Sequence, residues 1–150
     1  MLPYDFSLQN SEIGMSCGCL GVLYKPRYKR QVDEIYPRDP MDEKIIATEM
    51  DKLKYYTLNH PEKLGRIGDY LLSIVDTGLY KGQDGWVKVS IDAMVELLRP
   101  NHDRINLFVS SYLEICSKLL AEKKQKKFRV WGSEAFVQFS KEEEGSVQEQ

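Results

Sequence analysis

The feature that most restricts the fold of this chain is a helical spacing of apolar residues that recurs from about residue 42 to residue 139. In the middle of it, Leu64, Ile67, Leu71 and Ile74 fall three or four positions apart, so they would share one face of an α-helix. No stretch shows the sustained alternation of apolar and polar residues that a half-buried strand requires. The chain is therefore predicted to be all-α.

Short polar breaks divide this pattern into a succession of helices. Asn59-His60-Pro61 separates the first two, because proline is tolerated in the first turn of a new helix and not in a helix interior. Gly132 would permit close packing of the last helix against a neighbour. The helices are expected at residues 42–58, 61–79, 86–98, 104–122 and 126–139.

The spacing of the helices indicates how they pack. The first and third long helices begin about 44 residues apart, and each is followed by a second helix, which is the period of armadillo and HEAT hairpins. A short armadillo/HEAT-like stack is therefore predicted for residues 42–140, although a plain helical bundle would give the same order of helices. The acidic residues 141–150 carry no apolar face, and disorder is expected there.

Two thiols stand beside a group of cations near the start of the chain. Fatty acid on Cys17 and Cys19, in an expected flexible segment of residues 1–23, would insert hydrocarbon into a bilayer. Residues 24–41, an expected basic membrane-proximal segment and turn, would face anionic lipid at about 1 kcal/mol per cation. Neither attachment is stable alone, so their adjacency predicts a combined anchor. Its positive charges, called the anchor cations below, are Lys25, Arg27, Lys29 and Arg30.

Other roles for the cysteines are less well supported. Zinc would need paired ligands, and Cys116, His60 and His102 show none of the spacing of metal sites, so no metal is expected. Cys116 lies in an apolar helical run and is expected to be a core residue. Unmodified thiols at Cys17 and Cys19 remain the open alternative to acylation.

Neither a membrane-spanning helix nor a secretory signal is predicted. The uncharged residues 13–24 would extend roughly 18 Å as a helix, against a hydrocarbon core of about 30 Å. Residues 1–12 contain acidic residues and no lysine or arginine, whereas a secretory signal begins with a basic region. Attachment to a membrane would therefore depend on the thiols and cations.

The motifs that might indicate catalysis or nucleic-acid binding lack the required context. Residues 14–18 match the G-x-S-x-G elbow of serine hydrolases, but no sheet precedes them, and both histidines lie in interhelix breaks. No enzymatic activity or cofactor is expected. A second basic cluster is expected to be a solvated loop, with lipid headgroups or nucleic acid as alternatives; a pI near 5.8 argues against nucleic acid. This cluster is Lys123, Lys124, Lys126, Lys127 and Arg129.

Several blocks of the sequence together resemble a known family. Residues 24–33, YKPRYKRQVD, are preceded by Cys-Gly-Cys and followed by Ile-Tyr-Pro, and they are similar to the amino-terminal signature of the Rolling blackout family, also called EFR-three homologues. The resemblance extends over about residues 15–140. Its further blocks are residues 50–56, 61–71, 85–87, 93–94, 105–109, 118–120 and 132–139.

The resemblance implies a noncatalytic, all-helical rod of armadillo/HEAT-like repeats on the cytoplasmic face of the plasma membrane. By position, Cys17 and Cys19 match the palmitoylated cysteines of the family, and the anchor cations match its basic patch. Members recruit phosphatidylinositol 4-kinase III alpha through a tetratricopeptide-repeat adaptor, so that phosphatidylinositol 4-phosphate is made there. Anionic phospholipid and that kinase complex are thus the expected partners, and nucleic acid is not.

Two departures from the family accompany this expectation. Fourteen residues precede Met15, and initiation at Met15 would restore the family's position of the cysteines near the start. Members run to several hundred residues, so the adaptor-binding carboxyl region is not expected in this chain. The alternative function is a soluble helical interaction module, or a truncated product without a lipid anchor.

Overall fold

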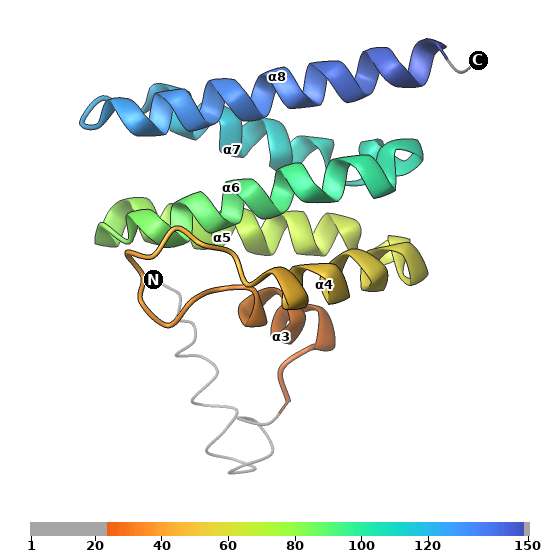
Figure 1. Cartoon of the computed structure of the whole chain (residues 1–150), viewed down its shortest axis with the longest axis horizontal. Helices are drawn as coiled ribbons and strands as arrows, with labels where there is room; N and C mark the ends of the chain where they lie inside the picture. Colours follow the sequence, from red (N-terminus) through yellow and green to blue (C-terminus); the bar gives the residue numbers. More distant parts are fainter. Residues whose placement is uncertain (1–23, 149–150) are drawn as a thin grey trace.

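The computed structural model describes residues 24–148, which fold into α-helices and short 3-10 helices (Figure 1). No strand occurs among these residues, which confirms the all-α class. Within the described range, no helix is both long and apolar enough to cross a membrane. The elements are α3 (Arg27–Glu34), α4 (Ala47–Asn59), η1 (Pro61–Lys63), α5 (Leu64–Lys81), α6 (Asp84–Leu98), η2 (Arg99–Leu107), α7 (Val109–Ala121) and α8 (Lys126–Gln148).

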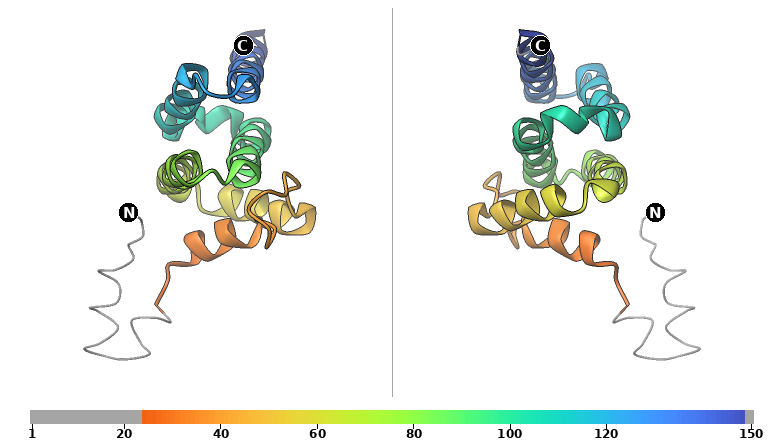
Figure 2. Two further views of the ribbon diagram at one scale, coloured as in Figure 1. Left: turned by 90° about the vertical axis from the view of Figure 1, so that its left-hand side faces the viewer. Right: turned by 90° about the vertical axis from the view of Figure 1, so that its right-hand side faces the viewer.

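The helices are stacked in two columns that rise from α3 and α4 at one end to α7 and α8 at the other (Figure 2). Helices α5 and α6 form one hairpin, and α7 and α8 form the next. Helix α7 packs on α5, and α8 packs on α6. The predicted stack of helical hairpins is therefore confirmed. The pairing differs from expectation, because α5 pairs with α6 and α7 with α8, and the helices at residues 42–58 and 86–98 are not each paired with the helix that follows.

The core is built from the apolar stripes that the sequence predicts. In α5, the side chains of Leu64, Ile67 and Leu71 are completely buried, as predicted, whereas Ile74 is half-buried and the adjacent Val75 is completely buried in its place. Burying a side chain of this size contributes about 2 kcal/mol relative to leaving it in water. The helical period thus determines which side of α5 faces α6 and α7.

A close contact joins α7 to α8, as the position of Gly132 predicts. A Cβ atom at Gly132 would lie 2.9 Å from the Cβ of Leu119 and 3.1 Å from the carbonyl oxygen of Cys116. Nearby, the Tyr112 hydroxyl donates a hydrogen bond of 2.6 Å to the carbonyl oxygen of Ala135. The two helices approach closely because glycine adds no side chain between them.

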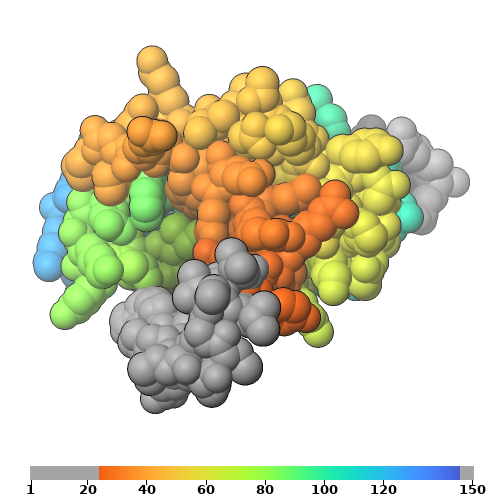
Figure 3. Space-filling model, turned by 90° about the horizontal axis from the view of Figure 1, so that it is seen from below, coloured from red at the N-terminus to blue at the C-terminus, as the bar shows by residue number. Residues whose placement is uncertain are grey.

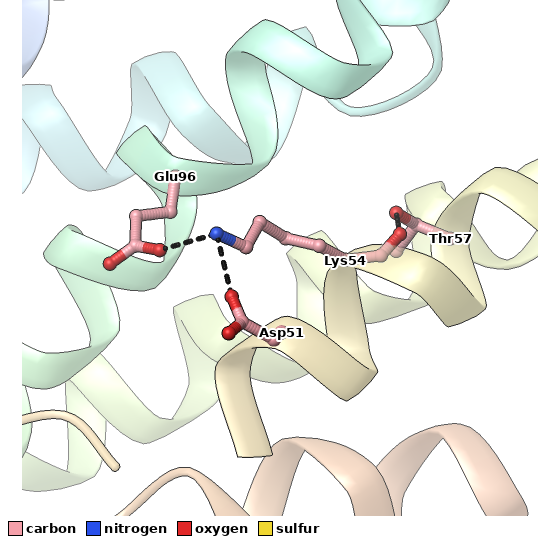
Figure 4. Close-up of polar contacts among 4 residues, drawn as sticks. All are labelled: Asp51, Lys54, Thr57 and Glu96. Carbon is pink, nitrogen blue, oxygen red and sulfur yellow. Dashed lines mark hydrogen bonds and ion pairs between the residues drawn. The ribbon is translucent and has the colours of Figure 1, made fainter. Parts of the chain in front are cut away.

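An ion-pair cluster connects α4 to α6 across the stack (Figure 4). The Lys54 ammonium lies 3.1 Å from a carboxylate oxygen of Glu96 on α6 and 3.1 Å from one of Asp51 on α4. Hydrogen bonds to Glu96 and then Asp51 raise the pKa of Lys54. Because the cluster is partly exposed, it contributes little to stability. Its main effect is to fix the position of α4 relative to α6.

The first predicted helix, at residues 42–58, begins later than expected. Asp42 accepts a hydrogen bond of 2.9 Å from the backbone N–H of Lys44, and Asp39 accepts one of 2.9 Å from that of Met41. These aspartates form local turns in place of a helix start, and α4 begins only at Ala47. The segment at residues 24–41, predicted to be basic and turned, also contains the short helix α3.

The chain beyond residue 99 differs from expectation in two places. The helix predicted from residue 104 is preceded by the 3-10 run η2, in which buried Asn101 donates to Thr57 Oγ1 at 3.1 Å and to the Leu97 carbonyl at 3.0 Å. Helix α8 continues to Gln148, through residues for which disorder was predicted. Glutamate has good helix propensity, and Glu142 lies 3.6 Å from Arg99 across the stack.

Candidate functional site

The anchor cations lie on or beside α3, at the end of the stack that Figure 3 shows. In that view α3 crosses the middle of the face, with the following loop and α4 beside it. The side chains of Lys25, Arg27 and Arg30 are exposed, and Lys29 is half-buried. Cys17 and Cys19, the predicted acylation sites, lie outside the described residues.

Two of the anchor cations hold α3 against α5. Lys25 forms an ion pair with Asp33, and Asp33 also accepts a hydrogen bond of 2.7 Å from the Tyr70 hydroxyl. The ammonium groups of Lys25 and Lys29 lie 5.8 and 5.1 Å from the centre of the Tyr70 ring, within range of a cation–π interaction. Burial, followed by the charge of Asp33, raises the pKa of the Tyr70 phenol. These residues therefore form a polar joint between α3 and α5.

The other two anchor cations differ in their contacts. The Arg27 guanidinium lies 5.4 Å from the centre of the Tyr56 ring, beside a hollow of about 550 Å³ between α3 and α4. The Tyr56 ring in turn lies 4.7 Å from the His60 ring. Arg30 is exposed. The structure thus brings the anchor cations onto one short segment but divides them among several directions, and membrane binding by them stays a prediction.

Residues on α5 that the sequence analysis did not single out complete this region. Tyr28, Lys29, Arg66 and Tyr70 contribute to a second hollow, of about 350 Å³, between α3 and α5. Burial raises the pKa of the Tyr28 phenol, against the opposing effect of the nearby Arg66 guanidinium. The four-residue spacing of Arg66 and Tyr70 places both on one face of α5, but sequence alone does not tell which helix that face meets.

The remaining candidate residues occupy structural positions. Cys116 is buried, as predicted, and burial raises the pKa of its thiol to about 11. His60 lies 3.4 Å from Glu62, and His102 contacts the Arg99 carbonyl at 3.0 Å. The G-x-S-x-G motif lies outside the described residues.

The second basic cluster is partly engaged within the protein. Lys127 lies 2.7 Å from Asp84, and Arg129 donates to the carbonyl oxygen of Glu122 at 2.8 Å. Lys123, Lys124 and Lys126 are exposed around the turn between α7 and α8. The predicted solvated interhelix loop therefore holds for Lys123 and Lys124, whereas the other three cations of the cluster lie in the first turn of α8.

Comparison with known proteins identifies the family. The family model for the EFR3 armadillo repeat matches residues 50–148. The chain belongs to the EFR3 family. The resemblance noted from the sequence blocks is therefore confirmed, and this EFR3-family chain is an armadillo-repeat protein.

Curated relatives agree with this assignment. The EFR3-family chain is 43% identical over 129 residues to Protein EFR3 homolog B of Homo sapiens and 40% identical over 129 residues to Protein EFR3 homolog A of Homo sapiens. It is 39% identical over 130 residues to Protein EFR3 homolog of Caenorhabditis elegans. Each match covers 85% of this chain and 15% of the relative, so the chain spans a small part of their length. No solved structure matches the chain.

Proposed function

We propose that this EFR3-family chain is a noncatalytic, peripheral scaffold on the cytoplasmic side of the plasma membrane. Acyl groups on Cys17 and Cys19 insert into the bilayer, and the anchor cations face its anionic lipids. The observation that carries the proposal is the exposure of Arg27 and Arg30 on α3, which begins eight residues after Cys19 along the chain. Recruitment of a phosphatidylinositol 4-kinase through an adaptor is the finer part of the proposal and rests on the family resemblance.

The contacts of the anchor cations reduce the electrostatic part of this attachment. Each cation near an anionic surface contributes about 1 kcal/mol, which would total roughly 4 kcal/mol for four free cations. Because Lys25 is paired with Asp33, its charge is largely compensated, and about 3 kcal/mol remains. That free energy corresponds to transient binding, so most of the affinity for the membrane comes from the acyl groups.

Replacing Cys17 and Cys19 with serine is expected to move most of the protein from the membrane fraction to the cytosol. Without an inserted acyl chain, only the transient electrostatic attraction remains. Fractionation of cells that express a tagged chain measures the change. Cys116→Ala is the matched control and should leave the distribution unchanged, because that thiol is buried. Retention of the double variant in the membrane fraction would contradict the acyl anchor.

Among the anchor cations, Arg30 is expected to matter more than the Lys25–Asp33 pair. Arg30→Gln removes an exposed charge and should weaken binding to vesicles that contain phosphatidylserine by about fivefold. The double variant Lys25→Gln/Asp33→Asn removes a pair of opposite charges and should change binding less than about twofold. Vesicle co-sedimentation at low salt measures both. Equal losses would show that the pair does not compensate Lys25.

The alternative is a soluble helical interaction module with unmodified thiols. It is favoured by the helical stack, whose core is formed by the protein's own side chains and does not require a lipid. Hydroxylamine-sensitive fatty-acid labelling of the protein from cells separates the two functions. Labelling that disappears in the Cys17→Ser/Cys19→Ser variant supports the membrane scaffold, and an unlabelled native protein supports the soluble module.

A further inference from the structure

A polar hollow of about 350 Å³ lies between α3 and α5, next to the anchor cations. Helix α5 contributes four side chains, at positions 66, 69, 70 and 73, each of which has another three or four residues away, and α3 contributes two consecutive ones. Because residues at this spacing share one side of a helix, the hollow is built on a rigid element and not on a loop. Its walls are Tyr28, Lys29, Arg66, Asp69, Tyr70 and Ser73.

The charges around the hollow favour an anion. Lys29 and Arg66 supply two cations, and neither forms an ion pair with a carboxylate in the part of the chain that the structure describes. Asp69 is the one carboxylate in the wall, so the wall carries a net charge of +1, and its Oδ1 accepts a hydrogen bond of 2.6 Å from the Ser111 hydroxyl. Asp33 lies outside the wall, where it forms an ion pair with Lys25 and accepts a hydrogen bond from Tyr70.

The neutral groups of the wall suit the same ligand. Tyr28 lines the hollow, and its hydroxyl has no side-chain hydrogen bond to another residue in the described range, so it can donate one to an oxygen atom of a ligand. The Tyr70 ring faces the Lys29 ammonium at 5.1 Å and holds it at the edge of the hollow. An arginine, a lysine and a phenol that converge on one hollow are a donor set for phosphate oxygens, which arginine can bind with two N–H groups at once.

We propose that this hollow binds the phosphate monoester of a lipid headgroup, with Arg66 and Lys29 as the paired cations. A phosphate monoester presents three terminal oxygen atoms, one more than a phosphodiester, so it can accept hydrogen bonds from Arg66, Lys29 and Tyr28 together. The inference rests on the proposed function, because acylation at Cys17 and Cys19 would hold α3 and the hollow at the bilayer surface. Arg66 thereby becomes a ligand-binding residue distinct from the anchor cations.

A titration with soluble short-chain lipids tests this site without a membrane. The full chain is titrated with dioctanoyl phosphatidic acid, a phosphate monoester, and with dioctanoyl phosphatidylserine, a diester with the same tails, both below the micelle concentration. We expect saturable binding of phosphatidic acid that is at least about fivefold tighter than binding of phosphatidylserine. Arg66→Gln should weaken the binding of phosphatidic acid about tenfold or more.

Arg38→Gln is the matched control, because it removes the same charge from an exposed position outside the hollow and outside the anchor cations. It should weaken the binding of phosphatidic acid by less than about twofold. Both arginines are exposed, so neither change should lower the melting temperature, and circular dichroism checks this.

Three outcomes would overturn the site. Equal losses in the two arginine variants would indicate general attraction of anions. Equal affinity for the two lipids would remove the preference for a monoester. Competition by inorganic phosphate at the concentration at which phosphatidic acid binds would assign the hollow to free phosphate. None of these outcomes affects the acyl anchor, which the cysteine variants test separately in cells.

Discussion

Replacing Gly85 with alanine is expected to lower the free energy of unfolding by about 3 kcal/mol or more. A Cβ atom at this position would lie 2.4 Å from the carbonyl oxygen of Asp42 and 2.4 Å from the carbonyl carbon of Met41. Both are backbone atoms, so no side chain can rotate away, and either α6 or the loop before α4 must shift. Thermal unfolding followed by circular dichroism should show a melting temperature lower by roughly 10 °C.

Gly145→Ala provides the matched control. A Cβ atom at Gly145, near the end of α8, would meet nothing within 4 Å. Since alanine favours helix over glycine, this variant should be equal to the parent or more stable by up to about 1 kcal/mol. If Gly85→Ala instead stays within about 1 kcal/mol of the parent, then the loop does not hold α6 as closely as the structure has it.

The periodic part of the fold could be predicted because it depends on neighbouring residues. Leu64, Ile67 and Leu71 lie on one face of α5 whatever the rest of the chain does, so the helical spacing alone identifies the buried side. The spacing does not decide between Ile74, which is half-buried, and Val75, which is fully buried. The contact at Gly132 could be anticipated for the same reason, since a glycine within an apolar helix often marks a close approach.

The start of α4 could not be predicted, because two local patterns compete there. Asp42 is a good residue to begin a helix, but its carboxylate also closes a turn by accepting from the Lys44 backbone. The turn prevails because residues 37–42 lie against α6: the backbone N–H of Trp86 donates to the Pro40 carbonyl at 3.1 Å. That contact joins positions far apart in the chain, so the spacing of apolar residues cannot predict it.

The sequence could predict which residues belong to the candidate site, but not how they are arranged in space. A run of cations beside two cysteines identifies the segment without any structure. The partners of those cations come from elsewhere: Tyr70 on α5 lies beside Lys25 and Lys29, and Tyr56 on α4 lies beside Arg27. Only the packing of α3 on both helices shows that some of the cations hold the fold together while others face outward.

Replacing Trp86 with alanine is expected to loosen the loop at residues 36–40, which follows α3. The Trp86 indole N–H donates to the Pro37 carbonyl at 3.0 Å, and the indole ring lies 5.6 Å from the Tyr36 ring. Tyr36 in turn bonds to Ser90 on α6 at 2.7 Å. Loss of the ring removes both contacts, so the free energy of unfolding should fall by about 3 kcal/mol, the lower end of the range for tryptophan because Trp86 is half-buried.

Limited digestion with trypsin measures the local part of this effect. Arg38 is exposed in the loop that Trp86 holds, and cleavage after it should be faster in Trp86→Ala, whereas cleavage after exposed Lys124 should be unchanged under native conditions. Trp86→Phe keeps a ring and loses the hydrogen bond, so its cost should be nearer 1 kcal/mol. If alanine and phenylalanine cost the same, the ring contact does not hold the loop. If cleavage after Arg38 is unchanged in Trp86→Ala, the contacts of Trp86 with Tyr36 and Pro37 do not hold the loop.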